Sequence, residues 1–187
     1  MIELIIAYVF LATFFLLDTF LRKGKTAKSL DKTASDNRST LFLVITFFTV
    51  LFISVILNCL KIGTFHNELI SIIGLLIMAI GLFIRISSIL TLGKYYTRKL
   101  LTTDTQEIVQ NGIYKYLRHP GYLGTILIWS AAGIAMQNLA VFIMATVLIL
   151  ASYYYRITNE EKMLLETFGE KYTDYKKHSW RIVPFIW

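Results

Sequence analysis

The amino-acid sequence predicts an all-α, polytopic membrane protein with five transmembrane helices. Of its 187 residues, 56% are hydrophobic and 17% are charged, whereas an average soluble domain has about 45–50% apolar and about 25% charged residues. Its apolar runs approach the roughly 20 residues that a helix needs to cross a bilayer. Lysine and arginine concentrate in alternate segments between these runs, which is the pattern of a chain that crosses a membrane repeatedly.

The first three predicted spans occupy the N-terminal half of the chain. They run from Ile2 to Leu21, from Leu41 to Leu60 and from Leu69 to about Leu92. The first begins with Glu3 and carries its basic residues after the apolar run, so we interpret it as a retained transmembrane helix and not as a signal peptide. The third contains Arg85, which either only extends its side chain toward the nearby membrane boundary or has a functional role.

The last two predicted spans form a tight helical hairpin. They run from Tyr122 to about Met136 and from Leu139 to Tyr155, and only Gln137 and Asn138 separate them. A connection this short makes the two helices antiparallel neighbours. Apolar and tyrosine side chains recur at helical spacing after the fifth span. They predict a cytoplasmic, amphipathic C-terminal helix that ends or is interrupted near Gly169.

The distribution of basic residues orients the predicted spans. The successive segments outside the spans contain six, one, five, no and six lysine or arginine residues, and Arg85 completes the 19. Because cytoplasmic loops are enriched in these residues, the alternation predicts an N-terminus outside and a C-terminus in the cytoplasm. The net charge of +7 then reflects topology, and we expect no nucleic-acid partner. We expect a single integral membrane domain over residues 1–187, with three helices in residues 1–92 and the functional core in residues 93–187.

The stretch "RHPGYLG" begins the fourth predicted span with an unusual set of side chains. Pro120 suits the first helical position, which places His119 at the cap. The free N–H groups there and the helix dipole favour an anion. The two glycines leave the backbone open to a flat ligand, and Tyr122 can stack or hydrogen-bond. The alternative is a helix start with an interfacial anchor, and Arg118 is the residue that we expect to be an anchor only.

A second polar cluster, "YYYRITNEEK", follows the fifth predicted span. Arg156 and Glu160 are four residues apart and share a helix face, either as a surface ion pair or as part of a site. Ionisable groups at this depth usually face a cavity or a partner and not lipid. The hairpin brings this cluster close to "RHPGY", so an arginine, an imidazole, two carboxylates and a helix N-terminus are predicted to surround one pocket that suits a zwitterion. The three dispersed histidines and one cysteine form no metal-ligand set.

These motifs carry a resemblance to a known family. The stretches "GIYKYLRHPGYLG", "RITNEEKMLLETFGEKYTDYKK" and "IVPF", in this order around a helical hairpin, resemble the isoprenylcysteine carboxyl methyltransferases, which are integral membrane enzymes that use S-adenosylmethionine. The resemblance covers roughly residues 93–187, whereas the first two spans match only in being apolar. It implies S-adenosyl-L-methionine as the cofactor, a lipophilic or lipidated substrate, and contact with membrane lipid.

Carried over by position, the resemblance assigns site residues. Arg156 is implied to meet the acceptor substrate and is the predicted catalytic residue. One departure concerns Gln106, because the family often has a histidine at this position, although glutamine can still hydrogen-bond. The implied cofactor contacts are Gln106, Glu107, Ile108, Val109, Tyr114, His119, Pro120, Gly121, Tyr122 and Glu160.

The implied chemistry is methyl transfer from a sulfonium to a carboxylate at the cytoplasmic boundary. A carboxylate is ionised at pH 7 and needs no general base, so catalysis depends mainly on proximity and alignment, with Arg156 orienting the acceptor. Two alternatives stay open. An N-methyltransferase of phospholipid head groups requires a deprotonated amine, beside which Arg156 is unfavourable. A non-enzymatic membrane scaffold that binds anionic lipid predicts no saturable S-adenosylmethionine binding. The sequence contains no signal for oligomeric state.

Overall fold

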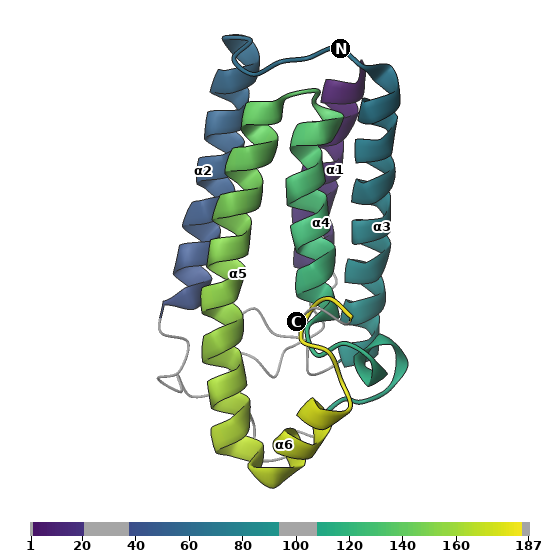
Figure 1. Cartoon of the computed structure of the whole chain (residues 1–187), viewed down its shortest axis with the longest axis vertical. Coiled ribbons are helices and arrows are strands. Elements are labelled where there is room, and N and C mark those ends of the chain that lie inside the picture. The colour runs from purple at the N-terminus through teal and green to yellow at the C-terminus, as the bar shows by residue number, and fades with distance from the viewer. Residues whose placement is uncertain (1, 21–37, 94–107, 185–187) are drawn as a thin grey trace.

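The computed structural model describes residues 2–20, 38–93 and 108–184, and within these ranges the chain is helical apart from two isolated β-bridges (Figure 1). The long helices run side by side along the long axis of the molecule. The elements are α1 (Ile2–Phe20), α2 (Ser39–Cys59), α3 (Glu68–Leu92), the short 3₁₀ helix η4 (Gly112–Lys115), α4 (Pro120–Ala135), α5 (Leu139–Phe168) and α6 (Glu170–Lys177).

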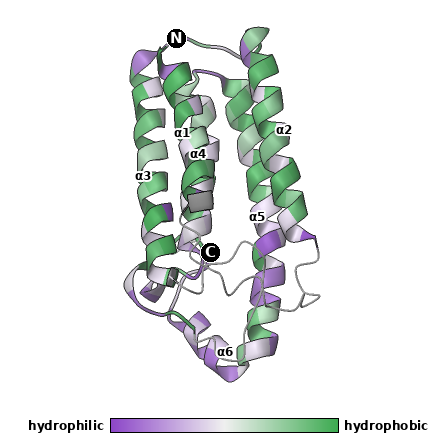
Figure 2. Cartoon of the chain, turned by 180° about the vertical axis from the view of Figure 1, so that it is seen from behind, coloured by the Kyte–Doolittle hydropathy of each residue, from purple (hydrophilic) through white to green (hydrophobic). Residues whose placement is uncertain are grey.

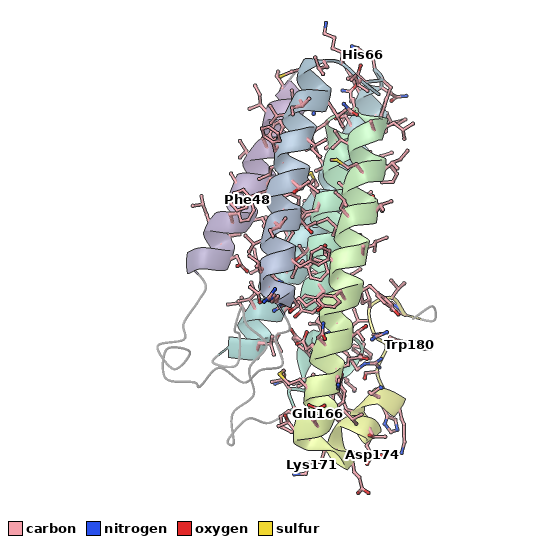
Figure 3. All side chains as sticks on the ribbon, turned by 90° about the vertical axis from the view of Figure 1, so that its left-hand side faces the viewer. Phe48, His66, Glu166, Lys171, Asp174 and Trp180 are labelled. Carbon is pink, nitrogen blue, oxygen red and sulfur yellow. The ribbon has the colours of Figure 1, made fainter. Side chains whose placement is uncertain are left out.

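The two ends of the bundle differ in what they contain. α4 packs against α1, α3 and α5, and α2 packs against α5. Two short connections, residues 60–67 and residues 136–138, lie together at one end, which we call the turn end. Helix α6 lies at the opposite end, which we call the α6 end. In Figure 3, His66 marks the turn end, and Lys171 and Asp174 mark the α6 end.

Glycines bring α3 and α4 into close contact. A Cβ added at Gly81 would lie 2.7 Å from the backbone oxygen of Gly124, and one added at Gly124 would lie 2.6 Å from the backbone oxygen of Gly81. Glycines permit this approach because they have no side chain between the two backbones. In lipid, such close van der Waals packing drives the association of helices. The register of α3 against the first turns of α4 is therefore fixed.

Aromatic rings fill the centre of the bundle. Trp129 of α4 is fully buried. It stacks on Phe47 of α2 with 4.6 Å between ring centroids, and Phe14 of α1 meets it edge-on at 6.0 Å. Such aromatic pairs contribute about 0.5–1.5 kcal/mol beyond the burial of their area. This cluster ties α1, α2 and α4 together between the two ends.

The outer surface of the bundle is apolar. Helices α2, α3 and α5 are long and apolar enough to cross a membrane, and α4 is a shorter apolar helix. Phe48 and Phe83 are 63% and 71% exposed, and Phe48 points away from the bundle in Figure 3. Figure 2 shows hydrophobic residues along the bundle and hydrophilic residues over α6 and the adjoining part of α5. So much exposed apolar surface is unusual for a soluble monomer and suits a helical membrane protein.

The helix boundaries agree with the predicted spans except in α5. α1, α2, α3 and α4 begin and end within two residues of the prediction, and the helical hairpin is present. α5 does not end at Tyr155 but continues as one helix to Phe168, because no helix-breaking residue intervenes. Gly169, with φ of 54°, ends it, and α6 follows. The count of five membrane spans and the cytoplasmic, amphipathic character of the C-terminal helix stay predictions.

Neutral amide side chains connect the helices at the turn end. Asn138 is fully buried. Its Oδ1 accepts a backbone N–H of α5 at 3.0 Å, and its Nδ2 donates to Oδ1 of Asn58 at 3.2 Å. Asn58 donates to the carbonyl of Ser54 at 2.8 Å, and Oε1 of Gln137 accepts the N–H of Asn67 at 2.9 Å. These amides therefore find their partners within the protein.

Candidate active site

The start of α4 is held by the C-terminal tail. Pro120 occupies the first helical position and His119 is the N-cap, as the sequence predicts. The N–H of Arg118 donates to the carbonyl of Trp180 at 2.8 Å, and the N–H of His119 donates to the carbonyl of Arg181 at 3.2 Å. This pairing was not predicted, because a bridge between two short segments far apart in the chain leaves no periodic pattern in the sequence.

The Glu161 carboxylate of α5 is the centre of a charged cluster at the α6 end. Its Oε1 accepts from Nε of Arg118 at 3.0 Å and lies 3.2 Å from Nε2 of His119. Its Oε2 lies 3.1 Å from Nε of Arg181. A buried carboxylate is unfavourable unless it is paired and hydrogen-bonded, and Glu161 is both. The cluster therefore joins the segment before α4, the late part of α5 and the tail.

Arg118 belongs to this cluster, which corrects the expectation that it serves only as an anchor. Its side chain is 9% exposed. Besides Glu161, its guanidinium reaches the backbone carbonyls of Ser179 and Lys176. A guanidinium has five N–H donors in a fixed fork and suits several acceptors at once. No pattern in the sequence indicates this role of Arg118, because two of its acceptors are backbone atoms of a distant segment.

Arg156 of α5 is buried between α2 and α4. Its Nε donates to the hydroxyl of Tyr122 at 2.9 Å. Its Nη1 donates to the hydroxyl of Ser39 at 3.3 Å and to that of Thr40 at 3.1 Å. The guanidinium also lies 5.6 Å from the centroid of the Tyr122 ring. Because Ser39 and Thr40 begin α2, the N-terminal half of the chain also contributes side chains to the site.

Tyr122 connects Arg156 to the charged cluster. Its ring stacks on that of His119, with 5.4 Å between centroids and an interplanar angle of 2°. The ring of Tyr153 packs against it at 4.9 Å. Arg156, Tyr122 and His119 therefore form a continuous row from the membrane helices to Glu161.

Glu160 lies beside this row. Its Oε2 is 3.7 Å from Nδ1 of His119. This oxygen is buried and has no hydrogen-bond partner in the described part of the chain. Leaving a buried acceptor unsatisfied costs free energy, so such atoms in native proteins usually have a specific explanation, such as a catalytic role or an unobserved water or ion. Glu160 follows Arg156 by one helical turn, so the two side chains share a face of α5.

Helix α3 fixes the first turn of α4 from another side. Nη1 of Arg85 donates to the carbonyl of Gly121 at 3.2 Å, and its Nη2 pairs with Oδ1 of Asp18 in α1 at 2.7 Å. One turn later, Oγ of Ser88 lies 2.5 Å from the hydroxyl of Tyr114 in η4. Arg85 thus pairs inside the protein with Asp18 and with the carbonyl of Gly121, and a functional role for this residue stays a prediction.

The two glycines of "RHPGYLG" face α3. A Cβ added at Gly121 would lie 2.8 Å from Oγ of Ser88, and the Cα of Gly124 approaches Gly81 as described above. We expected these glycines to open the backbone to a flat ligand. The structure gives a different reason for them, which is close packing of α4 on α3. The contact between Gly121 and a cofactor stays a prediction.

The structure brings most of the predicted site residues to the α6 end. Ile108 and Val109 lie in an irregular, half-buried segment that precedes η4. Gln106 and Glu107 lie outside the described residues. Over residues 2–20, 38–93 and 108–184, no three histidine, cysteine, aspartate or glutamate side chains cluster as metal ligands. The predicted residues that lie together are Tyr114, His119, Pro120, Gly121, Tyr122, Arg156 and Glu160.

Three tyrosines around the cluster are buried. Burial raises the pKa of Tyr175 to about 12, and its hydroxyl donates to the carbonyl of Tyr114 at 2.6 Å. Burial also raises the pKa of Tyr114 well above its usual value. The pKa of Tyr172 is raised in the same direction by burial and by repulsion from the carboxylates of Glu161 and Glu160. All three phenols therefore stay protonated at physiological pH.

Several residues of the site were not predicted. Asp18 had a recognisable signal, because an acidic residue near the end of an apolar helix usually has a partner. Ser39, Thr40 and Ser88 had none, because small hydroxyl residues are common in membrane helices for packing reasons. Arg181 was counted only as a basic residue of the C-terminal segment.

The fold and the site together define a class of protein, namely a helical membrane protein whose ionisable side chains converge on a helix N-terminus at one end of the bundle. A sequence model of the Isoprenylcysteine carboxyl methyltransferase (ICMT) family matches residues 72–166, just over half of the chain. The chain belongs to this family, which confirms the resemblance seen in its motifs.

Individual relatives agree with this assignment. The protein-S-isoprenylcysteine O-methyltransferase of Dictyostelium discoideum is 34% identical over 123 residues, which cover 61% of this chain and 49% of the relative. A probable protein-S-isoprenylcysteine O-methyltransferase of Oryza sativa subsp. indica is 32% identical over 120 residues, which cover 63% and 62%. The solved structure of a eukaryotic intramembrane Ras methyltransferase ICMT matches with a TM-score of 0.60 and 25% identity, over 84% of this chain and 55% of that one. The chain thus spans 49% to 62% of the length of these proteins.

Proposed function

We propose that this chain is a methyltransferase that uses S-adenosylmethionine and methylates the carboxylate of a lipophilic, prenylcysteine-like acceptor. The observation that carries the proposal is the placement of Arg156 and Glu160 on successive turns of α5. Arg156 lies among the apolar helices, and Glu160 lies beside the charged cluster at the α6 end. An acceptor whose carboxylate is attached to a lipid needs a cation among apolar helices, and a polar cofactor needs an adjacent polar site. Membership of the family and the activity named for the relatives support the same function.

The residues at the α6 end fit S-adenosylmethionine, which carries an amino-acid end, a sulfonium, a ribose and an adenine. Oε2 of Glu160, buried without a hydrogen-bond partner among the described residues, suits an ammonium or hydroxyl donor. The N-terminus of α4 favours an anionic group. The stacked rings of His119 and Tyr122 suit a flat or cationic group. The other proposed contacts are Gln106, Glu107, Ile108, Val109, Tyr114, Pro120 and Gly121.

The surroundings of Arg156 fit a carboxylate on a lipid. Three hydroxyls, those of Tyr122, Ser39 and Thr40, hold the guanidinium between α2, α4 and α5. A guanidinium binds a carboxylate through charge-assisted hydrogen bonds, which are stronger than those of its hydroxyl partners. The hydrophobic part of such an acceptor can stay among the apolar helices while its carboxylate reaches Arg156.

The mechanism requires mainly alignment from the protein. S-adenosylmethionine supplies an electrophilic methyl group on its sulfonium. The acceptor carboxylate, with a reference pKa of about 3.5, is already ionised, so no residue needs to remove a proton. Arg156 binds this carboxylate and orients it toward the α6 end. Tyr122 and Tyr153 exclude water beside it, and alignment of two bound reactants accounts for most of the rate that such a site gains.

The orientation in the membrane is part of the proposal. The segments rich in lysine and arginine connect or follow helix ends that lie at the α6 end. Of the two turn-end connections, residues 60–67 contain only Lys61 and residues 136–138 contain no basic residue. The positive-inside rule then places the α6 end and the active site in the cytoplasm and the N-terminus outside. A cysteine introduced at residue 64 and labelled from one side of sealed vesicles tests this orientation.

A methyl-transfer assay tests the activity. Purified protein in nanodiscs is given S-adenosylmethionine with a labelled methyl group and a panel of prenylcysteine, fatty-acid-like and phospholipid acceptors. We expect label in the prenylcysteine acceptor and its loss in Glu160→Ala and His119→Ala variants. Saturable binding of S-adenosylmethionine is measured in parallel. A wild-type protein that does not bind this cofactor would favour a lipid-binding scaffold and would end the enzyme proposal.

The chemistry of the product separates the two methyltransferase alternatives. Methyl esters release labelled methanol in base, whereas methylated phospholipid amines do not. We expect methanol, because Arg156 is a favourable neighbour for a carboxylate and an unfavourable one for an amine that has to lose its proton. Base-stable label in a phospholipid would instead establish the N-methyltransferase.

A further inference from the structure

Helix α6 contains two tyrosines that differ in one respect. Tyr172 is 1% exposed, and its hydroxyl has no hydrogen-bond partner within the part of the chain that the structure describes. Tyr175 follows it by three residues, and the two rings lie 6.2 Å apart. The hydroxyl of Tyr175 donates to the carbonyl of Tyr114 at 2.6 Å. One hydroxyl is therefore satisfied by the protein, and the other is buried without a partner.

The side chain of Arg118 links α6 to the charged cluster. Arg118, which pairs with Glu161 at 3.0 Å, also donates to the carbonyl of Lys176 at 3.4 Å. It reaches the carbonyl of Ser179 just beyond the helix as well. The charges that act most strongly on the Tyr172 phenol are the carboxylates of Glu161 and Glu160. The ring of Tyr172 lies 6.2 Å from that of Tyr175, whose hydroxyl bonds to the carbonyls of Tyr114 and Leu117, so Tyr172 packs beside the segment that precedes α4 and carries the proposed cofactor contacts.

The hydroxyl of Tyr172 and Oε2 of Glu160 are both buried at this place without a hydrogen-bond partner among the described residues. They do not bond to each other. A group that satisfies both has to present an acceptor to the hydroxyl and a donor to the carboxylate. The amino-acid end of S-adenosylmethionine has this combination, because it carries an α-carboxylate next to an α-ammonium.

We infer that Tyr172 is a cofactor contact whose hydroxyl donates to the α-carboxylate of S-adenosylmethionine, while Glu160 accepts from its α-ammonium. The inference rests on the proposed function. It adds to the site a helix that lies beyond the family match at residues 72–166. Two arginines, Arg118 and Arg181, and two glutamates, Glu160 and Glu161, lie at this end of the bundle. Charges of both signs suit a zwitterion.

The test is the Tyr172→Phe variant of the full chain, purified in nanodiscs. Two quantities are measured, the Tm of the ligand-free protein and its affinity for S-adenosylhomocysteine, and only the affinity is expected to decrease. Thermal unfolding of the ligand-free variant is expected at the wild-type Tm or above it, because the substitution removes an unsatisfied buried hydroxyl. Binding of S-adenosylhomocysteine, measured by titration calorimetry without turnover, is expected to weaken about tenfold, the usual effect of losing one hydrogen bond to a charged group.

Two controls define the interpretation. Tyr175→Phe is expected to lower the Tm of the ligand-free protein, because the Tyr114 carbonyl loses its donor. 5′-Deoxy-5′-methylthioadenosine has the nucleoside but lacks the amino-acid end. We expect it to bind wild type and Tyr172→Phe with the same Kd.

Each other outcome overturns the inference in a distinct way. If Tyr172→Phe lowers the Tm as Tyr175→Phe does, the Tyr172 hydroxyl has a structural role. If S-adenosylhomocysteine binds the variant as tightly as it binds wild type, Tyr172 is no cofactor contact, although the proposed function stands. Equal weakening of both ligands assigns the contact to the nucleoside instead. If wild type binds neither ligand, the proposed function fails together with the inference.

Discussion

The two ends of the bundle use buried polar side chains in opposite ways. At the turn end, the amides of Asn58, Asn138 and Gln137 are neutral and bond to neighbouring parts of the protein. At the α6 end, the side chains are charged and join segments that are distant in the sequence. There, Oε2 of Glu160 and the hydroxyl of Tyr172 lack a partner among the described residues. The turn end is complete as it stands, whereas the α6 end retains hydrogen-bonding capacity for a ligand.

This difference shows that burial alone does not identify a functional site. Asn138 is buried as completely as any residue of the proposed site, yet its bonds explain its presence. What separates the α6 end is the combination of unsatisfied polar atoms with charges that converge from several segments. The comparison therefore predicts that substitutions of polar groups whose hydrogen bonds are complete affect stability, and that substitutions of the unsatisfied groups at the α6 end affect ligand binding and turnover.

The largest expected effect is a loss of stability on substitution of Asp18, whose carboxylate forms an ion pair with Arg85 inside the protein. Asp18→Asn removes this counter-charge from Arg85, and breaking a buried ion pair from one side costs about 3–5 kcal/mol. We expect a strong decrease in Tm. The double variant Asp18→Asn/Arg85→Gln is expected to recover most of that loss, because no buried charge is left uncompensated. A single variant that unfolds at the wild-type Tm would contradict the assignment of this pair.

Arg156→Lys is expected to have the largest effect on turnover. A lysine keeps the charge but loses the planar fork that contacts Tyr122, Ser39 and Thr40 and that orients the acceptor. We expect kcat/KM for a prenylcysteine acceptor to fall on the order of 100-fold, which matches the loss of hydrogen bonds to a charged group. The Kd for S-adenosylhomocysteine should change little. An equal loss in Kd would place Arg156 in the cofactor site instead.

Asn138→Ala tests the turn end. The substitution leaves the amide of Asn58 and a backbone N–H of α5 without their partner, and we expect a loss of about 1–3 kcal/mol in unfolding free energy. Turnover and the Kd for S-adenosylhomocysteine, measured well below the Tm, should remain at wild-type values. A specific loss of cofactor affinity in this variant would show that the two ends are coupled.

Glu160→Gln has the smallest expected effect and gives the sharpest contrast with Asn138→Ala. The amide keeps the size of the side chain but removes its charge. The Tm of the ligand-free protein should change little, because Oε2 has no described hydrogen-bond partner to lose and the amide can keep the contacts of the side chain with His119 and Tyr122. The Kd for S-adenosylhomocysteine should rise about tenfold, as for one hydrogen bond to a charged group. A lower Tm with unchanged Kd would make Glu160 a structural residue like Asn138.

The sequence predicted the elements that depend on local patterns. Apolar runs predicted the helices, the two-residue connection predicted the hairpin, and Pro120 predicted the start of α4. The hairpin then placed Arg156 and Glu160 close to His119 and Tyr122. These predictions succeeded because they rest on helix length and on the short reach of a tight turn.

The remaining parts of the site depend on contacts between distant segments. The role of Arg118 depends on backbone carbonyls of the tail, and that of Arg85 depends on Asp18 in another helix. Neither set of partners leaves a periodic signal in the sequence. The glycines were interpreted through the ligand, whereas their position against α3 is set by helix packing.

The length of the hairpin helices has a consequence for the thickness of the surrounding bilayer. α4 has 16 residues, so it extends about 24 Å at 1.5 Å per residue. The distance along α5 from Leu139 to Arg156 is about 26 Å by the same rise. In the predicted five-span arrangement, both lengths are shorter than a hydrocarbon layer of about 30 Å, so we expect the bilayer to thin beside the hairpin or the hairpin to sit below its surface. Methyl transfer should therefore depend on acyl-chain length, with higher rates in thin bilayers, where Arg156 lies closer to the water that delivers the methyl donor.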